Sequence, residues 1–156
     1  MGPEGVGKTT VGTLLARELG WQFADADDFH PRANIEKMSR GIPLTDADRA
    51  PWLEALHGAI VGWDAEGRNI VLACSALEKN YRARLAQNAD VKFVYLKGTY
   101  ELIAARLRKR EGHFAHDDLL TSQFAILEEP EDAITVDASL APGEIVMEVR
   151  KRLGMA

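Results

Sequence analysis

Apolar residues recur along the chain with two alternating periods, which predict helices that alternate with short buried strands. Helical spacing, with an apolar position every three or four residues, runs through 11–19, 53–60, 102–107, 119–127 and 145–153. Short apolar runs, typical of buried parallel strands, stand at 21–24, 69–75, 91–96 and 134–137. Strands that alternate with helices imply a parallel sheet with right-handed crossovers. The pattern therefore predicts an α/β fold.

Capping residues and a polar stretch refine this picture. Thr99 is placed to cap the helix that follows the third strand, and Pro142 to open the last helix. Pro51 suits the first turn of a helix. We therefore expect the helix with the apolar stripe at 53–60 to begin there. Residues 30–52 are too polar and too often interrupted to be core. Either a polar substrate pocket or a solvated insertion would explain them.

Composition and charge narrow the classes of protein that fit. We expect one domain over residues 1–156, because this length buries a sizeable core. A net charge of −5 gives no reason to expect nucleic acid as a partner. No apolar run is as long as a membrane span or a signal-peptide core, so no membrane partner is expected. Cys74 is the single cysteine, which excludes an internal disulfide and predicts a cytoplasmic location. With no base beside it, Cys74 is expected in the core rather than as a nucleophile.

The first residues carry the most specific chemical motif in the chain. Residues 2–9 read G-P-E-G-V-G-K-T and match G-x-x-x-x-G-K-[ST], a phosphate-binding loop. Glycines allow left-handed turns that direct backbone N–H groups at one anion, and the following helix adds its positive end. Lys8 can then reach the β- and γ-phosphates, and the Thr9 hydroxyl can ligate Mg²⁺. A glycine-rich turn that caps a helix is the alternative, but the helical stripe from 11 to 19 favours the motif.

Such a loop normally follows a buried strand, and here only Met1 precedes it. We therefore expect that the first strand is truncated in this sequence and that the natural chain begins several residues earlier with an apolar segment. An intact five-stranded sheet built from these residues alone would contradict that expectation.

Acidic residues follow the first apolar run. Asp25 and Asp27 stand directly after 21–24, and ligands of open α/β sheets bind outside the carboxyl ends of the strands. Two carboxylates at this spacing can bracket one Mg²⁺–phosphate region, with one near the metal and the other near an acceptor hydroxyl. D-x-D is a weak motif by itself, and an acidic loop or a helix cap would also explain it.

A basic cluster marks a second candidate for phosphate binding. Four of the five residues 106–110 are basic in an acidic chain, and Gly112 follows. This pattern predicts a mobile cationic lid over phosphates, at about 106–118. Arginine suits the task because it binds phosphate oxygens in a bidentate manner, although part of the charge complements the helix dipole. We expect a phosphate role for at least one of Arg106 and Arg110.

Further segments resemble the gluconokinases, relatives of shikimate kinase among the P-loop kinases. The matching segments are D-D-F-H-P at 27–31, N-I-E-K-M at 34–38, P-L-x-D-x-D-R-x-P-W-L at 43–53, C-S-A-L at 74–77 with Y-R at 81–82, R-x-G-H-F at 110–114 and Q-F-x-x-L-E-x-P at 123–130. The resemblance runs from Gly2 to about Asp137. Glu78 departs from it, because the family usually has Lys after Ser-Ala-Leu, although Lys79 is adjacent.

The resemblance implies ATP-dependent phosphorylation of D-gluconate at its 6-hydroxyl, with Mg²⁺ as cofactor. It implies a three-layer P-loop fold with five parallel strands in the order 2-3-1-4-5, helices on both faces, and a homodimer. The implied nucleotide and metal ligands are Gly2, Glu4, Gly5, Val6, Gly7, Lys8, Thr9, Thr10, Arg106, Arg110 and Pro142, with Thr9 and Asp25 near the metal. The implied gluconate ligands are Asp27, His30, Asn34, Lys37, Arg49 and Gln123, most of them in an insertion at about 28–52.

The resemblance also implies a role for each group. Asp27 would orient or deprotonate the acceptor hydroxyl, with Lys8 and Arg110 as its catalytic partners. Arg49, or Lys37 as a second candidate, would bind the carboxylate of the sugar acid. The hydroxyls of gluconate would bind His30, Asn34 and Gln123, and the loop at 137–142 would lie beside the adenine.

Two other functions fit part of the sequence. A kinase for shikimate or for a nucleotide shares the phosphate loop and the D-x-D motif, but it would not predict the pattern at 30–52. A non-catalytic nucleotide-binding remnant without its first strand would bind ATP and phosphorylate no sugar acid.

Overall fold

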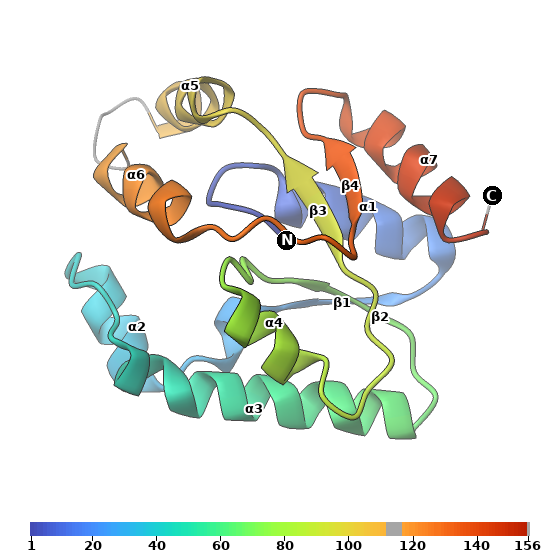
Figure 1. Cartoon of the computed structure of the whole chain (residues 1–156), viewed down its shortest axis with the longest axis horizontal. Coiled ribbons are helices and arrows are strands. Elements are labelled where there is room, and N and C mark those ends of the chain that lie inside the picture. The colour runs from blue at the N-terminus through green and yellow to red at the C-terminus, as the bar shows by residue number, and fades with distance from the viewer. Residues whose placement is uncertain (112–116, 156) are drawn as a thin grey trace.

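A computed structural model describes residues 1–111 and 117–155, and it confirms the predicted alternation of helices and strands (Figure 1). The strands are β1 (Gln22–Asp25), β2 (Ile70–Ala73), β3 (Val94–Lys97) and β4 (Ile134–Asp137). The helices are α1 (Lys8–Leu19), the 3-10 turn η1 (Ala26–Phe29), α2 (Arg32–Ser39), α3 (Asp46–Ala65), α4 (Lys79–Leu85), α5 (Tyr100–Glu111), α6 (Asp117–Ile126) and α7 (Pro142–Arg152). Every predicted strand overlaps an observed one.

The described strands form two parallel pairs, β1 with β2 and β3 with β4. The first two residues lie between the pairs. The Gly2 N–H donates to the Ser75 carbonyl at 3.1 Å, and the Leu96 N–H donates to the Met1 carbonyl at 3.0 Å. Met1 and Gly2 thus stand where the predicted order 2-3-1-4-5 has its central strand. The described residues contain no intact five-stranded sheet, and the expectation of a preceding apolar segment stays a prediction.

Helices cover both faces of the strands, and each face has its own cluster of buried apolar side chains. One cluster lies under the phosphate loop and joins α1, β3, α5, α6, β4 and α7. The other joins η1, α3, α4 and the end of β2, and it contains Trp52, Leu56 and Cys74. Burial raises the pKa of Cys74 to about 11, as expected for a core thiol rather than a nucleophile. This layered packing confirms the predicted fold class.

The helix after the polar insertion begins earlier than predicted. α3 starts at Asp46, so Pro51 lies inside the helix and not in its first turn. The cause is a capping box. The Asp48 N–H donates to Thr45 Oγ1 at 3.1 Å, and the Thr45 N–H donates to Asp48 Oδ2 at 2.9 Å. These reciprocal bonds satisfy N–H groups that a helix start leaves open, and they fix the start ahead of the proline.

Other predicted helix boundaries agree with the structure. Thr99 Oγ1 accepts from the Leu102 N–H at 3.1 Å at the start of α5, and Pro142 is the first residue of α7. Across residues 1–111 and 117–155, no helix combines the length and apolar character that a membrane span requires.

Candidate active site

The phosphate loop packs closely against helix α5. Gly5 has a φ of +81°, and a Cβ atom built there would lie 2.7 Å from Leu107 Cδ2. A larger residue would therefore meet both backbone strain and a steric clash at this position. The loop then enters α1, whose first residue is Lys8. This arrangement directs the positive end of α1 toward the space inside the loop.

Lys8 stands at the end of the phosphate loop, and its side chain reaches back to the start of that loop. Its Nζ donates to the carbonyl oxygens of Gly2 at 2.9 Å and Pro3 at 3.0 Å. Burial lowers the pKa of Lys8, while the charges of Asp27 and Asp25 act in the opposite direction. The ammonium group therefore lies within electrostatic reach of the D-x-D pair.

A cavity of about 320 Å³ opens beside the loop. Of the predicted nucleotide residues, those that line it are Gly5, Val6, Gly7, Thr10, Arg106, Arg110 and Pro142. Arg106 holds two of its walls together, because its guanidinium donates to the Val6 carbonyl at 3.3 Å and to the Ala138 carbonyl at 2.6 Å. Apolar residues also line the cavity: Val11, Leu107 and Ile145 from helices, and Ala138 and Leu140 from the loop at 137–142 that is predicted to lie beside the adenine. A space with a basic rim and an apolar wall suits a nucleotide.

The two predicted acids stand at the end of β1. Asp25 Oδ1 accepts from the Asp27 N–H at 2.9 Å, and this bond opens η1. Burial and then the neighbouring charge of Asp25 raise the pKa of Asp27, while His30 and Lys8 oppose that shift. Asp27 therefore lies between the phosphate loop on one side and the polar insertion on the other.

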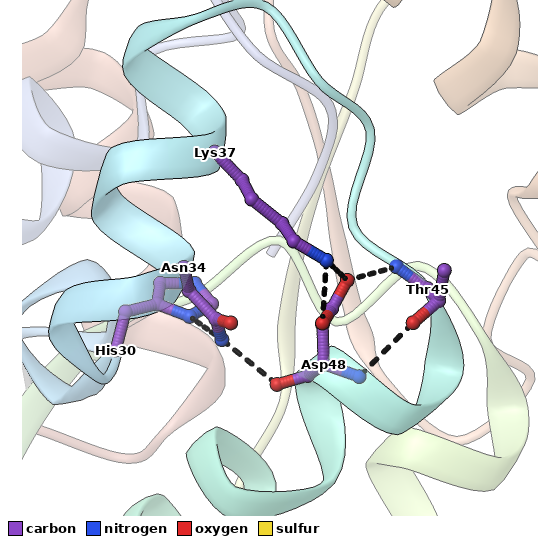
Figure 2. A network of polar contacts seen from close by, with 5 residues as sticks. All are labelled: His30, Asn34, Lys37, Thr45 and Asp48. Atoms are coloured by element: carbon purple, nitrogen blue, oxygen red, sulfur yellow. Dashed lines mark hydrogen bonds and ion pairs between the residues drawn. The ribbon is translucent and has the colours of Figure 1, made fainter.

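The predicted insertion residues His30 and Asn34 lie together, as Figure 2 shows. Asn34 is 3% exposed, and its Nδ2 lies 3.2 Å from His30 Nδ1 and donates to the Asp48 carbonyl at 2.8 Å. The His30 ring stacks on Trp52 with centroids 4.7 Å apart, and Trp52 Nε1 donates to the Ala26 carbonyl at 2.7 Å. These contacts join η1, α2 and α3 into one wall of the site.

Lys37 is engaged by a protein carboxylate. Its Nζ donates to both oxygens of Asp48 at 2.9 Å, across the gap between α2 and α3 (Figure 2). Hydrogen bonds from Thr45 and Lys37 lower the pKa of Asp48 to about 2. Of the two residues predicted to bind the substrate carboxylate, Lys37 is thus the one that already contacts both oxygens of a protein carboxylate.

Arg49 lies at the start of α3 and reaches α4. Its Nη1 donates to the Tyr81 hydroxyl at 3.3 Å and to Asp46 Oδ1 at 3.4 Å. The charge of Arg49 also contributes to the lowered pKa of His30, for which burial is the larger cause. Arg49 and His30 are therefore electrostatic neighbours.

Gln123 lies at the phosphate loop, where its Oε1 accepts from the Glu4 N–H at 2.6 Å. This contact places Gln123 on the donor side of the site, at the phosphate loop rather than among the insertion residues. Of the predicted metal ligands, Thr9 is exposed on the first turn of α1, and Asp25 ends β1. Among residues 1–111 and 117–155, no group of three acidic, histidine or cysteine side chains could hold a metal. Oxygen ligands from Thr9 and Asp25 suit Mg²⁺, which keeps waters and phosphate oxygens in its shell.

Sequence reasoning gave no role to Arg82, which is 7% exposed. Its guanidinium donates to the carbonyl oxygens of Ala76 at 2.7 Å, Leu77 at 3.0 Å and Glu128 at 2.6 Å. It thereby ties the loop after β2 to the segment after α6. The only signal in the sequence was the pair Tyr81-Arg82 in the family resemblance. The predicted lid at 106–118 includes residues 112–116, which lie outside the described part of the chain.

Comparisons with known proteins agree with this geometry. The family model for shikimate kinase matches residues 4–153. The chain is 50% identical over 133 residues to a gluconokinase from Gluconobacter oxydans, covering 85% of this chain and 75% of that protein. It is 43% identical over 142 residues to the thermoresistant gluconokinase of Escherichia coli, covering 88% and 81%.

Solved structures give the same result. A gluconokinase from Sinorhizobium meliloti has a TM-score of 0.89 at 39% identity, covering 99% of this chain and 89% of that one. A shikimate kinase from Bacteroides thetaiotaomicron shares the fold, with a TM-score of 0.67 at 22% identity. The phosphate loop, the parallel strand pairs and the family match define a P-loop kinase of the shikimate kinase type. Within that class, the chain belongs to the gluconokinase family.

Proposed function

We propose that this chain transfers the γ-phosphoryl group of ATP to the 6-hydroxyl of D-gluconate, giving ADP and 6-phospho-D-gluconate. One observation carries the proposal beyond the family likeness. Lys8 and Asp27 influence each other's pKa, Asp27 influences that of His30, and so does Arg49. Each of these four charged or titratable groups lies within electrostatic range of the next, from the phosphate loop to the polar insertion. That order matches a donor phosphate at one end and an anionic acceptor at the other.

The donor half of the site would bind the nucleotide through the loop and the cavity beside it. Backbone N–H groups of residues 5 and 7–10 and the ammonium of Lys8 would hold the phosphates, with Arg106 and Arg110 on the open side. Lys8 would exchange the Gly2 and Pro3 carbonyls for phosphate oxygens. Mg²⁺, when held by Thr9 and by the acid at Asp25, neutralises charge on the phosphate oxygens. Pro142 would border the adenine.

The acceptor half would position the hydroxyl at Asp27. The O6–H proton passes to the Asp27 carboxylate as O6 bonds to the γ-phosphorus, and the bond to the β–γ bridging oxygen breaks. Burial and Asp25 raise the pKa of Asp27, which makes it a stronger proton acceptor than an ordinary aspartate. Closure by Arg106 and Arg110 would exclude water, which competes with the sugar hydroxyl.

The carboxylate of gluconate would bind Arg49. Arginine has a planar set of donors that matches a carboxylate, and among the described residues the Arg49 side chain forms hydrogen bonds only with Asp46 and Tyr81. Lys37 is the weaker candidate because Asp48 already holds it with both oxygens. His30 and Asn34 would contact the hydroxyls. Gln123 would join them from the phosphate loop, where it contacts Glu4.

Several broader features belong to the same proposal. They are a single domain over 1–156, a lid over about 106–118, a homodimer and a cytoplasmic location. Arg106 and Arg110 at the rim of the nucleotide cavity support the lid.

An acceptor screen tests the proposed function. ADP release would be measured with gluconate, shikimate and nucleoside monophosphates, using this chain and one extended upstream. We expect turnover with gluconate alone. Turnover with shikimate or a nucleotide would replace the proposed substrate. ATP binding without turnover of any acceptor by either chain would instead indicate the non-catalytic remnant.

A further inference from the structure

Three side chains from two helices meet where the insertion approaches α4. The Tyr81 hydroxyl donates to Asp46 Oδ1 at 2.9 Å, and Arg49 Nη1 donates to that hydroxyl at 3.3 Å and to Asp46 Oδ1 at 3.4 Å. The side chain of Asp46 is 89% exposed, whereas that of Arg49 is 29% exposed. The guanidinium thus has two side-chain partners, the hydroxyl of Tyr81 on α4 and the solvent-exposed carboxylate of Asp46.

The two partners of Arg49 differ in how firmly they are fixed. Tyr81 stands on α4, which Leu85 and Arg82 anchor in the interior. Its hydroxyl donates one hydrogen bond, to Asp46, and accepts another, from Arg49. Asp46 has a single oxygen on the guanidinium, and 3.4 Å is longer than the 2.7–2.9 Å of a strong ion pair. Exposed pairs of this kind contribute little to stability.

The remaining donors of Arg49 fit a second carboxylate. All hydrogen bonds of the Arg49 side chain within the described residues run through Nη1, which leaves Nη2 and Nε open to a ligand. A substrate carboxylate can contact a guanidinium through two oxygens at once, which a single oxygen of Asp46 does not do. Such a ligand would bind beside Asp46, whose like charge opposes it, while Tyr81 keeps the guanidinium in place.

We propose that Tyr81 is a positioning residue for Arg49, and that the carboxylate of Asp46, held weakly at Nη1, competes with the carboxylate of gluconate for the charge of Arg49. This inference rests on the proposed function. It adds two residues to the acceptor site, one that supports binding of the sugar acid and one that competes with it. We therefore expect that removal of the Tyr81 hydroxyl and neutralisation of Asp46 move the KM for gluconate in opposite directions.

Two conservative variants test the opposite signs. Tyr81→Phe removes only the hydroxyl, and we expect the KM for gluconate to rise roughly fivefold or more, because a hydrogen bond to a charged group is lost. Asp46→Asn keeps an acceptor for Tyr81 but removes the competing charge, and we expect that KM to fall by roughly two- to fivefold. In both variants kcat and the KM for ATP should stay near the wild-type values.

Matched controls separate these effects from general ones. Tyr95→Phe removes a phenol that donates to Glu129, and Asp90→Asn removes an exposed carboxylate that pairs with Lys92. Both should leave the KM for gluconate unchanged. Thermal unfolding of all four variants reports any loss of fold.

A double variant distinguishes positioning from a merely structural role. If Tyr81 acts through Arg49, then Tyr81→Phe should not raise the KM further in an Arg49→Ala background. Additive effects of the two changes would overturn the positioning role, and an unchanged or higher KM in Asp46→Asn would overturn the competition. Wild-type turnover of gluconate with unaltered KM in both single variants would overturn the inference alone. A wild-type chain without gluconate turnover would overturn the proposed function and this inference with it.

Discussion

Asp48 accepts hydrogen bonds from Lys37 Nζ with both carboxylate oxygens, each at 2.9 Å, and thereby fastens helix α2 to the first turn of α3. The same carboxylate caps α3 through the Thr45 N–H. The backbone carbonyl of Asp48 also accepts from Asn34, so one residue organises three contacts of the insertion. A pairing of this kind gives Lys37 a structural task and favours Arg49 as the ligand for a carboxylate substrate.

Replacing Asp48 by Asn should destabilise the protein in a pH-dependent manner. The folded pKa of Asp48 is about 2, below the ordinary value of 3.8, so its ionised form is the one that folding favours. Its contribution is then complete above pH 4 and is lost as the pH falls toward 2. Urea unfolding midpoints of wild type and Asp48→Asn should therefore differ at pH 7 and converge in acid. A difference that persists unchanged to pH 2 would contradict the assignment, and Asp90→Asn serves as the exposed control.

Arg49 and Lys37 can be distinguished by kinetics. Arg49→Ala should raise the KM for gluconate by about tenfold or more with a smaller effect on kcat, because a bidentate carboxylate contact is lost. Lys37→Ala should chiefly lower the urea midpoint, because it removes the partner of Asp48. Steady-state kinetics with gluconate as the varied substrate provide the measurement. An unchanged KM in Arg49→Ala would exclude the carboxylate role of Arg49.

Asp27→Asn should leave the nucleotide bound but slow the chemical step. A general base contributes roughly 10²- to 10⁴-fold to a rate, and we expect a loss of kcat in that range. The affinity for ATP, measured by calorimetry, should change little because Asp27 lies on the acceptor side of Lys8. If kcat fell less than tenfold, Asp27 would be an orienting group rather than the proton acceptor.

Gly5→Ala should impair ATP binding more than it impairs folding. The new Cβ would stand 2.7 Å from Leu107 Cδ2 at a φ of +81°, so the loop must shift away from α5. Gly20→Ala is the matched control, because Gly20 also has a positive φ, +71°, yet nothing lies within 4 Å of its Cβ position. Each change should cost on the order of 1–2 kcal/mol of stability from backbone strain. Only Gly5→Ala should weaken ATP binding, and equal ATP affinities for the two variants would contradict this account of the loop.

Local patterns in the sequence predict the helices and strands well, and they propose the residues of the donor half of the site. Apolar periods locate the helices and strands, and the motif at residues 2–9 identifies the phosphate loop. α3 begins earlier than Pro51 predicts, because Thr45 and Asp48 form a capping box that fixes the helix start ahead of the proline. Contacts between distant residues were not predictable from local pattern. Gln123 bonds to Glu4 across 119 positions, and Tyr81 meets Arg49 across 32, because tertiary packing alone brings them together.

The buried guanidinium of Arg82 illustrates the same limit. An arginine in a short polar helix reads as a surface residue, since charged side chains are rarely buried without partners. Its three carbonyl partners come from a loop and from a segment beyond α6, and only the folded chain assembles them.

The central claim is that a phosphoryl group passes from ATP at this loop to the 6-hydroxyl of gluconate. Phosphorus NMR of the reaction with ATP, Mg²⁺ and D-gluconate tests it most directly, with Lys8→Ala as the inactive comparison. We predict a new phosphate monoester signal coupled to the two protons on C6, formed in step with ADP and absent with Lys8→Ala. Inorganic phosphate as the sole new signal, a monoester at another carbon, or undiminished product with Lys8→Ala would contradict the claim.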